Sequence, residues 1–200
     1  MKKLLLSILL FNLLCFSSEE HNELQIGLGY NQVSFNEKES SIEFDDDDLK
    51  QPAESGSLSV ISLNASYGIL NFSKQTLFVN GVFPLVNSGD ENYYQGSISI
   101  KHYFKNLNTI KNYDFPDGNL TISPRFRYYL GLETGVAYMV YITTNAKKDD
   151  TSFLLRALGG ASYMFTQKMG VDVEAGYGRA TGSITSSALL SGSLSLVLFI

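Results

Sequence analysis

Residues 124–142 read PRFRYYLGLETGVAYMVYI and alternate between two kinds of side chain along their whole length. In an extended strand, successive side chains point to opposite faces. One face, from Phe126 to Ile142, is almost entirely aliphatic or aromatic, whereas the other carries Arg125, Arg127 and Glu133. Globular strands usually run for roughly five or six residues, and a tilted strand crosses a bilayer in about 9–11. Because a packed core would not accept these charges unpaired, the stretch predicts a membrane-crossing strand with its charged face inside a barrel.

The last ten residues, SGSLSLVLFI (191–200), repeat this pattern. Leucine or isoleucine occupies the even positions from Leu194 to Ile200, and the other face begins with two serines. A barrel closes by pairing its last strand with its first, with lipid against one side. We therefore expect 191–200 to belong to the closing strand.

Six other segments alternate in the same way, near 24–31, 60–67, 77–85, 94–102, 155–164 and 171–178. With the two strands above, they predict an all-β fold, an eight-stranded antiparallel up-and-down transmembrane β-barrel. An even strand number places both ends on the periplasmic side. External loops are then expected near 36–56, 87–93, 143–152 and 181–189, and inner connections at 68–75, 105–122 and 166–169. Pro84 is expected to mark the end of its strand. Segment 105–122 is long for an inner turn, so it contains either an irregular excursion or a missed strand.

The first residues have the pattern of a signal peptide over residues 1–17, because Lys2 and Lys3 precede an apolar run from Leu4 to Phe16. Lipid attachment at Cys15 and a retained anchor are the alternatives. Residues 18–200 then form the barrel domain, which we expect in the cell outer membrane. Removing residues 1–17 leaves 13 basic and 20 acidic residues, a net charge of −7, and no cysteine. This acidic balance argues against a nucleic-acid partner.

Two stretches resemble a known family. Residues 128–138, YYLGLETGVAY, are similar to a glycine- and tyrosine-rich strand of small outer-membrane proteins, and 158–179 is similar to the hairpin that follows it. The family includes the OmpA membrane domain and OmpX. The resemblance implies an eight-stranded barrel inserted by the outer-membrane assembly machinery, which reads a C-terminal strand usually ending in Phe. Here Phe199 is penultimate.

Charged residues on the inward faces are the main candidate site. They are Lys101, Arg125, Arg127, Glu133, Arg156, Asp172 and Glu174. An eight-stranded barrel is just wide enough for side chains, so interior charges must pair. We predict a structural charge network that plugs the barrel, with Arg125 and Arg127 facing Asp172 and Glu174 near the periplasmic end. In this arrangement Glu133 lies at mid-height and Arg156 near the outer end. A proton or ion path through the interior is the alternative.

Two other features have a structural interpretation. Residues 43–48, EFDDDD, could offer oxygen ligands from Asp45 to Asp48 to calcium, but they lack the glycine turn and distant glutamate of an EF-hand loop, which favours a solvated loop tip. Seven tyrosines on the predicted lipid face fit the aromatic girdles of membrane barrels. These are Tyr30, Tyr67, Tyr94, Tyr128, Tyr138, Tyr163 and Tyr177.

The sequence favours a non-catalytic role. His21 and His102 are the only histidines, and neither has a nearby serine and aspartate for a catalytic relay, so we expect no catalytic, metal or cofactor site. The expected function is a structural element or a platform for surface loops. The expected partners are outer-membrane lipid, lipopolysaccharide phosphates near Arg179, Lys147 and Lys148, the assembly machinery and an extracellular partner of the loops. A soluble periplasmic ligand-binding barrel and a narrow pore are the alternatives.

Overall fold

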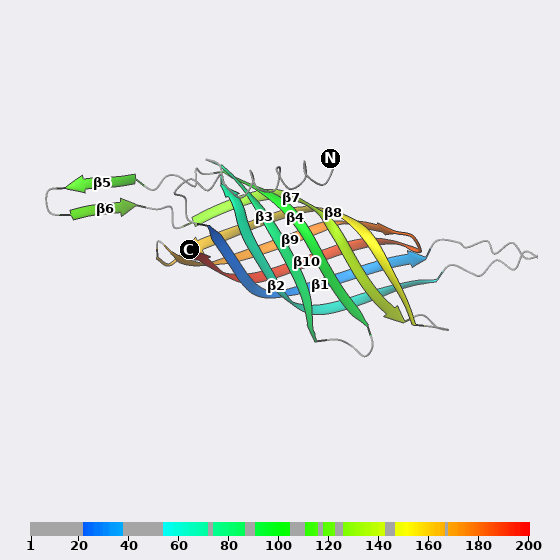
Figure 1. The fold of residues 1–200 in the computed structure, drawn as a ribbon. Coiled ribbons are helices and arrows are strands. Elements are labelled where there is room, and N and C mark those ends of the chain that lie inside the picture. Colours follow the sequence, from blue (N-terminus) through cyan, green and yellow to red (C-terminus); the bar gives the residue numbers. More distant parts are fainter. Residues whose placement is uncertain are drawn as a thin grey trace, which may run out of the picture.

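The computed structural model describes residues 22–37, 54–71, 74–86, 91–104, 111–115, 118–122, 126–142, 147–166 and 168–200. Within these residues, eight antiparallel strands form one closed barrel (Figure 1). Its strands are β1 (Glu23–Glu37), β2 (Ser55–Asn71), β3 (Gln75–Val86), β4 (Asn92–Tyr103), β7 (Phe126–Ile142), β8 (Lys147–Met164), β9 (Met169–Gly182) and β10 (Thr185–Phe199). The predicted eight-stranded up-and-down barrel is confirmed. The described residues contain no helix with the length and apolarity needed to span a membrane.

The barrel closes through its first and last strands. β1 pairs with β10 without interruption from Glu23 opposite Phe199 to Glu37 opposite Thr185. Beyond the ladder, the backbones of Asn22 and Ile200 exchange two further hydrogen bonds, of 3.2 and 2.9 Å. The end where β1 begins and β10 finishes is called the lower end below, and the opposite end the upper end.

The strict alternation of β7 is preserved in three dimensions. Leu130 and Leu132 point outward with 59% and 60% of their surface exposed, while Arg127 and Glu133 point inward with 4% and 2% exposed. All seventeen residues of β7 pair with β8. Because side chains fill the interior of an eight-stranded barrel, every strand sorts its residues between this interior and the outer wall.

Several strands are longer than predicted at the upper end. β8 begins at Lys147 and β10 at Thr185, so much of the loops expected at 143–152 and 181–189 is strand. The outward residues of these segments are mainly polar, so they lack the apolar alternation that marks the rest of the barrel, but their backbones still pair with neighbouring strands. Of the loop expected at 36–56, residues 38–53 lie outside the described part of the chain.

The structure differs from the sequence prediction at Pro84 and in segment 105–122. Pro84 does not end its strand, because β3 continues to Val86. The proline lies beyond the pairs between β3 and β4, which end at Val82, and next to a register shift between β2 and β3. A residue without a backbone N–H is tolerated at such a place. Segment 105–122 contains a regular pair of strands, β5 (Lys111–Phe115) and β6 (Gly118–Ile122), which form a two-stranded sheet of their own, separate from the barrel sheet.

Candidate functional site

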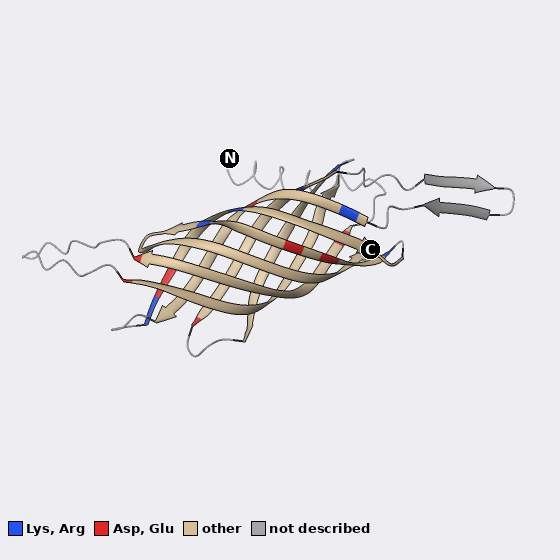
Figure 2. Cartoon of the chain, turned by 180° about the vertical axis from the view of Figure 1, so that it is seen from behind, with Lys and Arg blue, Asp and Glu red and all other residues tan. Residues whose placement is uncertain are grey.

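Among the described residues, three ion pairs lie in the barrel interior at or below mid-height. They join β1 to β7, β4 to β9, and β7 to β8. Six of the seven predicted residues face inward in the described structure, and Arg125 lies outside the described residues. Charged positions are few along the barrel strands, as Figure 2 shows. The name "charged network" is used below for Glu23, Lys101, Arg127, Glu133, Arg156, Asp172 and Glu174.

Arg127 pairs with Glu23 at the lower end. The Nη1 atom of Arg127 lies 3.3 Å from Oε2 of Glu23, and both side chains are almost fully buried. The guanidinium also lies over the rings of Tyr103 and Phe199, with its Cζ 5.3 and 5.0 Å from the two ring centres. Gln25 donates a 2.7 Å hydrogen bond to Glu23. The pair is therefore held between two aromatic rings and an amide.

Lys101 pairs with Glu174 a little higher. The Nζ atom lies 2.7 Å from Oε2 of Glu174 and 4.6 Å from the centre of the Tyr129 ring. The Tyr129 hydroxyl is 2.8 Å from Oδ2 of Asp172 and 2.8 Å from Oε2 of Glu174. Ser162 donates a hydrogen bond to the other oxygen of Asp172.

The third pair lies at mid-height, where Glu133 and Arg156 are opposite each other across the β7–β8 ladder. Nε of Arg156 donates a 2.7 Å hydrogen bond to Oε2 of Glu133, and Nη1 donates another of 2.7 Å to Ser191. Gly176 makes room for this side chain, because a Cβ there would lie 2.9 Å from Cδ of Arg156. Gln95 and Ser97 donate to Oε1 of Glu133, so both of its oxygens accept hydrogen bonds.

The upper half of the interior is mostly apolar, with a few buried polar residues toward its rim, among them Asp150 and Thr185. Twelve buried residues form one cluster, called the apolar plug below. They are Val33, Phe35, Leu58, Val60, Val82, Tyr93, Ala137, Met139, Tyr141, Leu154, Ala180 and Leu189. Above the plug, Nζ of Lys148 lies 2.9 Å from both carboxylate oxygens of Glu37.

The structure corrects two predicted details of the charged network. Arg127 was expected to face Asp172 and Glu174, but its partner is Glu23. Arg156 was expected near the outer end, but it lies at mid-height opposite Glu133. The first error arises because strands in a barrel are staggered, so counting residues from a strand end does not give the partner across the interior. The second arises because β8 begins at Lys147, earlier than predicted, which moves Arg156 from the end of the strand to its middle.

Sequence reasoning missed Glu23 as a site residue. Its signal was present, because the outward phase of Leu24, Ile26 and Leu28 puts Glu23 and Gln25 on the inward face. Lys148 was expected in an external loop, but it lies in β8 and forms an ion pair inside the barrel. The acidic residues from Asp45 to Asp48 lie outside the described residues.

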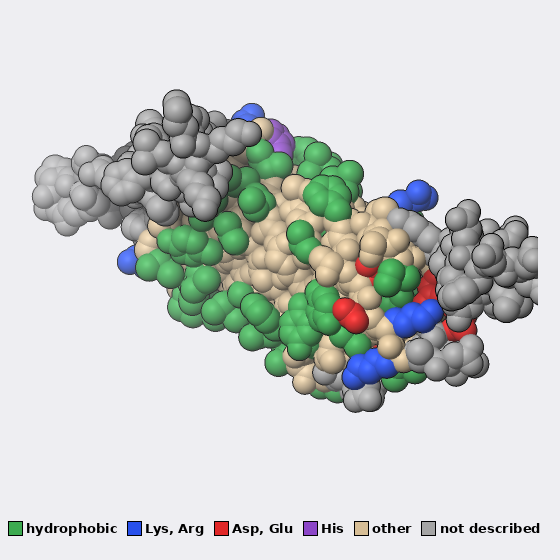
Figure 3. All heavy atoms as spheres, turned by 45° about the vertical axis from the view of Figure 1, so that its right-hand side comes forward, with side chains coloured by type: hydrophobic (Ala, Val, Ile, Leu, Met, Phe, Trp, Pro, Cys, Tyr) green, Lys and Arg blue, Asp and Glu red, His purple; other side chains and the backbone are tan. Residues whose placement is uncertain are grey.

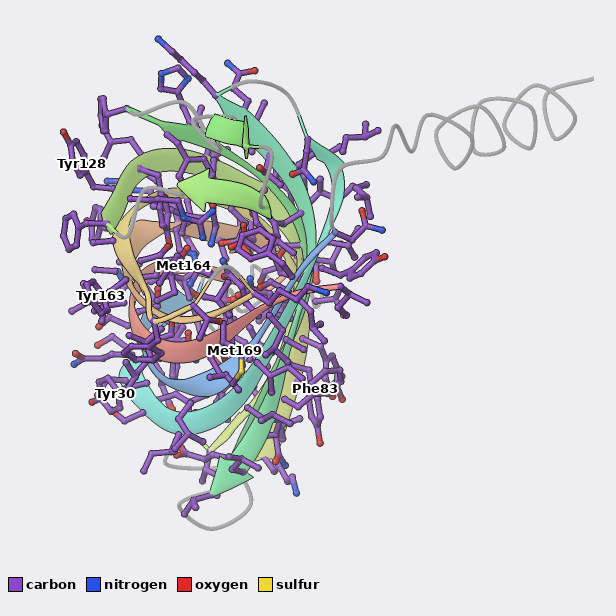
Figure 4. All side chains as sticks on the ribbon, turned by 90° about the vertical axis from the view of Figure 1, so that its left-hand side faces the viewer. Tyr30, Phe83, Tyr128, Tyr163, Met164 and Met169 are labelled. Carbon is purple, nitrogen blue, oxygen red and sulfur yellow. The ribbon has the colours of Figure 1, made fainter. Side chains whose placement is uncertain are left out.

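The outer wall is apolar through its middle. The exposed large residues include Leu28, Ile98, Leu132, Leu155, Val173 and Leu194. Figure 3 shows hydrophobic side chains over the visible wall and charged ones toward its ends. The rings of Tyr30, Phe83, Tyr128 and Tyr163 lie outside the wall, whereas Met164 lies within it (Figure 4).

All seven tyrosines predicted on the lipid face are confirmed as outward, with 39–61% of their surface exposed. Tyr128 and Tyr163 lie near the lower end, next to Phe104 and Phe165 respectively, with ring centres 5.4 and 5.5 Å apart. Tyr94 and Tyr138 lie toward the upper end, with ring centres 6.4 Å apart. Aromatic rings at two levels of the wall are typical of the two interfaces of a bilayer.

A polar cavity of about 490 Å³ lies on the outer wall toward the upper end of β1, β2, β9 and β10. Its outward polar side chains are Ser34, Asn36, Ser55, Ser57, Arg179 and Ser186. Arg179 is exposed. Hydroxyl, amide and guanidinium groups in this arrangement can bind phosphate or sugar oxygens.

The described residues contain no group of three or more His, Cys, Asp or Glu placed to hold a metal ion. His102 points outward at the lower end, where its ring lies edge-on to Phe104 at 6.0 Å between centres. His21 lies outside the described residues.

No family model matches the sequence, and no curated protein matches it either. Among solved structures, the chain is similar to the outer membrane protein OprG from Pseudomonas aeruginosa, at 16% identity over 90% of this chain and 97% of that one, with a TM-score of 0.52. It is also similar to the neisserial surface protein A, NspA, at 14% identity over 88% and 97% of the two chains, with a TM-score of 0.42. The N-terminal β-barrel domain of Pseudomonas aeruginosa OprF gives 8% identity over 84% and 96%, with a TM-score of 0.45. The likeness to OprG shows that the chain has the fold of a small outer-membrane β-barrel.

Proposed function

We propose that the protein is an integral outer-membrane barrel with a closed interior and a non-catalytic role, either structural or as a support for its external loops. The observation that carries this proposal is the direction of its side chains. Leucine, isoleucine and valine point out of the wall, while Glu23, Arg127, Glu133 and Arg156 are buried inside it. A soluble barrel that carries an apolar ligand would need the reverse arrangement.

The contents of the interior support the proposal that it is closed. The ion pairs of the charged network fill the lower half and the apolar plug fills the upper half. A narrow pore is the alternative, and single-channel recording in planar bilayers separates the two. We expect silent bilayers, and regular conductance steps from purified protein would contradict a closed interior.

The proposed partners of the wall are membrane lipids. The two levels of aromatic rings match bilayer interfaces, and the cavity beside Arg179 lies just beyond the apolar part of the wall. A lipopolysaccharide headgroup would place phosphate and sugar oxygens at this height. Lys148 takes no part in this contact, because it pairs with Glu37 inside the barrel. Two further partners are proposed. The outer-membrane assembly machinery recognises β10, and an extracellular partner binds the external loops.

Leu132→Arg tests the membrane location. Leu132 lies midway along β7 with 60% of its surface exposed, so the substitution places a charge near the bilayer midplane. We expect the free energy of unfolding in lipid vesicles, measured by urea titration, to fall by about 2–4 kcal/mol.

The matched control is Ile142→Arg, at the upper end of the same strand, where 49% of the side chain is exposed. A charge near the interface costs about 0–1 kcal/mol. Equal losses for the two variants, or no loss for either, would show that the wall of β7 does not cross a bilayer.

A further inference from the structure

Within the part of the chain that the structure describes, the lower interior contains one more carboxyl group than it has cations to pair with. Among the described residues there, Glu23, Asp172 and Glu174 face Lys101 and Arg127. Arg127 pairs with Glu23, and Lys101 pairs with Glu174. Asp172 is 1% exposed, and its hydrogen bonds come only from hydroxyl groups. A buried carboxylate without a cation is costly, so such a group takes up a proton instead.

The contacts of Tyr129 require the same proton. Its hydroxyl oxygen is 2.8 Å from a carboxylate oxygen of Asp172 and 2.8 Å from one of Glu174. A phenol has a single hydrogen to donate, so it can satisfy only one of these two contacts. The other contact needs a hydrogen on a carboxyl group, with the phenol oxygen as acceptor.

We propose that the lower interior is a proton-binding site, in which Asp172 carries a proton on Oδ2 and donates it to Tyr129. Tyr129 then donates its own hydrogen to Glu174, which stays ionised because it also accepts from Lys101 at 2.7 Å. The other oxygen of Asp172 accepts from Ser162. Every contact in the chain of hydrogen bonds then has one hydrogen.

Among the described residues, Tyr129 and Ser162 are the hydrogen-bond partners of Asp172, and no ion pair includes it. The Tyr103 hydroxyl is fully buried and has no hydrogen-bond partner among the described residues. Arg156 and Glu133 neutralise each other at mid-height. With the proton in place, the charges of the described residues in the lower interior sum to zero, and loss of the proton adds one buried negative charge beside Glu174. The Glu174 side chain keeps 18% exposure, which gives water a route for exchanging the proton.

Infrared spectroscopy of the full chain refolded in lipid vesicles tests the proposal. A protonated carboxyl group has a carbonyl band that is separate from the bands of carboxylates. We expect this band at neutral pH in the unsubstituted protein, and we expect Asp172→Asn to remove it. Asp149→Asn, on the outer wall of β8, is the matched control and should leave the band in place.

Isotope labelling gives a second measurement that needs no substitution. With ¹³C at the side-chain carboxyl of aspartate, the band should move to lower frequency, and the same label on glutamate should leave it unmoved. The proposal is overturned if the band is missing at neutral pH, if it moves with the glutamate label, or if it survives Asp172→Asn.

Discussion

The two halves of the barrel interior are filled in opposite ways. The lower half holds the charged network, in which each cation pairs with a carboxylate. The upper half holds the apolar plug, in which Phe35, Leu154 and their neighbours pack without charges. The lower half depends on the pairing of its charges, because a buried charge that loses its partner has little water to replace it.

Among these variants, Arg156→Met should lower the free energy of unfolding most. It removes one partner of the pair at mid-height and leaves Glu133 buried without a cation. We expect the free energy of unfolding in detergent micelles or vesicles to fall by about 3–5 kcal/mol.

The double variant Glu133→Leu with Arg156→Met extends the apolar packing down to mid-height. Most of the lost stability should return, because no unpaired charge is left. If the double variant were as unstable as Arg156→Met alone, the requirement for pairing would not be the reason for the loss.

Leu154→Ala tests the apolar plug. Leu154 is fully buried, so the truncation leaves a cavity, and we expect a loss of about 3 kcal/mol in urea unfolding. Leu155→Ala, one residue along β8 and 58% exposed on the outer wall, is the control and should cost clearly less. Similar losses at the two positions would argue against a packed upper interior.

Lys148→Met should lower the free energy of unfolding least. The Lys148 side chain is 30% exposed, so its pair with Glu37 is screened by water. We expect a loss of about 0.5 kcal/mol in low salt, and the loss should vanish as the salt concentration rises. A large loss that does not change with salt would show that this pair behaves like those of the charged network.

The alternation of side chains along the strands was enough to predict which residues lie on the outer wall of the barrel. The alternation of β7 assigned Leu132 to the outer face and Glu133 to the interior, and the structure has both side chains on those faces. It was not enough at the upper ends of β8 and β10, where polar outward residues hide the strands. The hairpin of β5 and β6 was also not predicted as regular structure, since it lies outside the barrel and shares none of its ladders.

The sequence by itself determined the fold class and the face of each strand, because a strand has a period of two residues and that period is visible along the chain. Only the tertiary structure decided which charges meet. The stagger of the eight strands sets the height of each residue, so it brings Glu23 to Arg127 and Glu174 to Lys101. Among the described residues, it also leaves Asp172 outside every ion pair. A local repeat contains no information on this stagger, which depends on how the whole sheet closes.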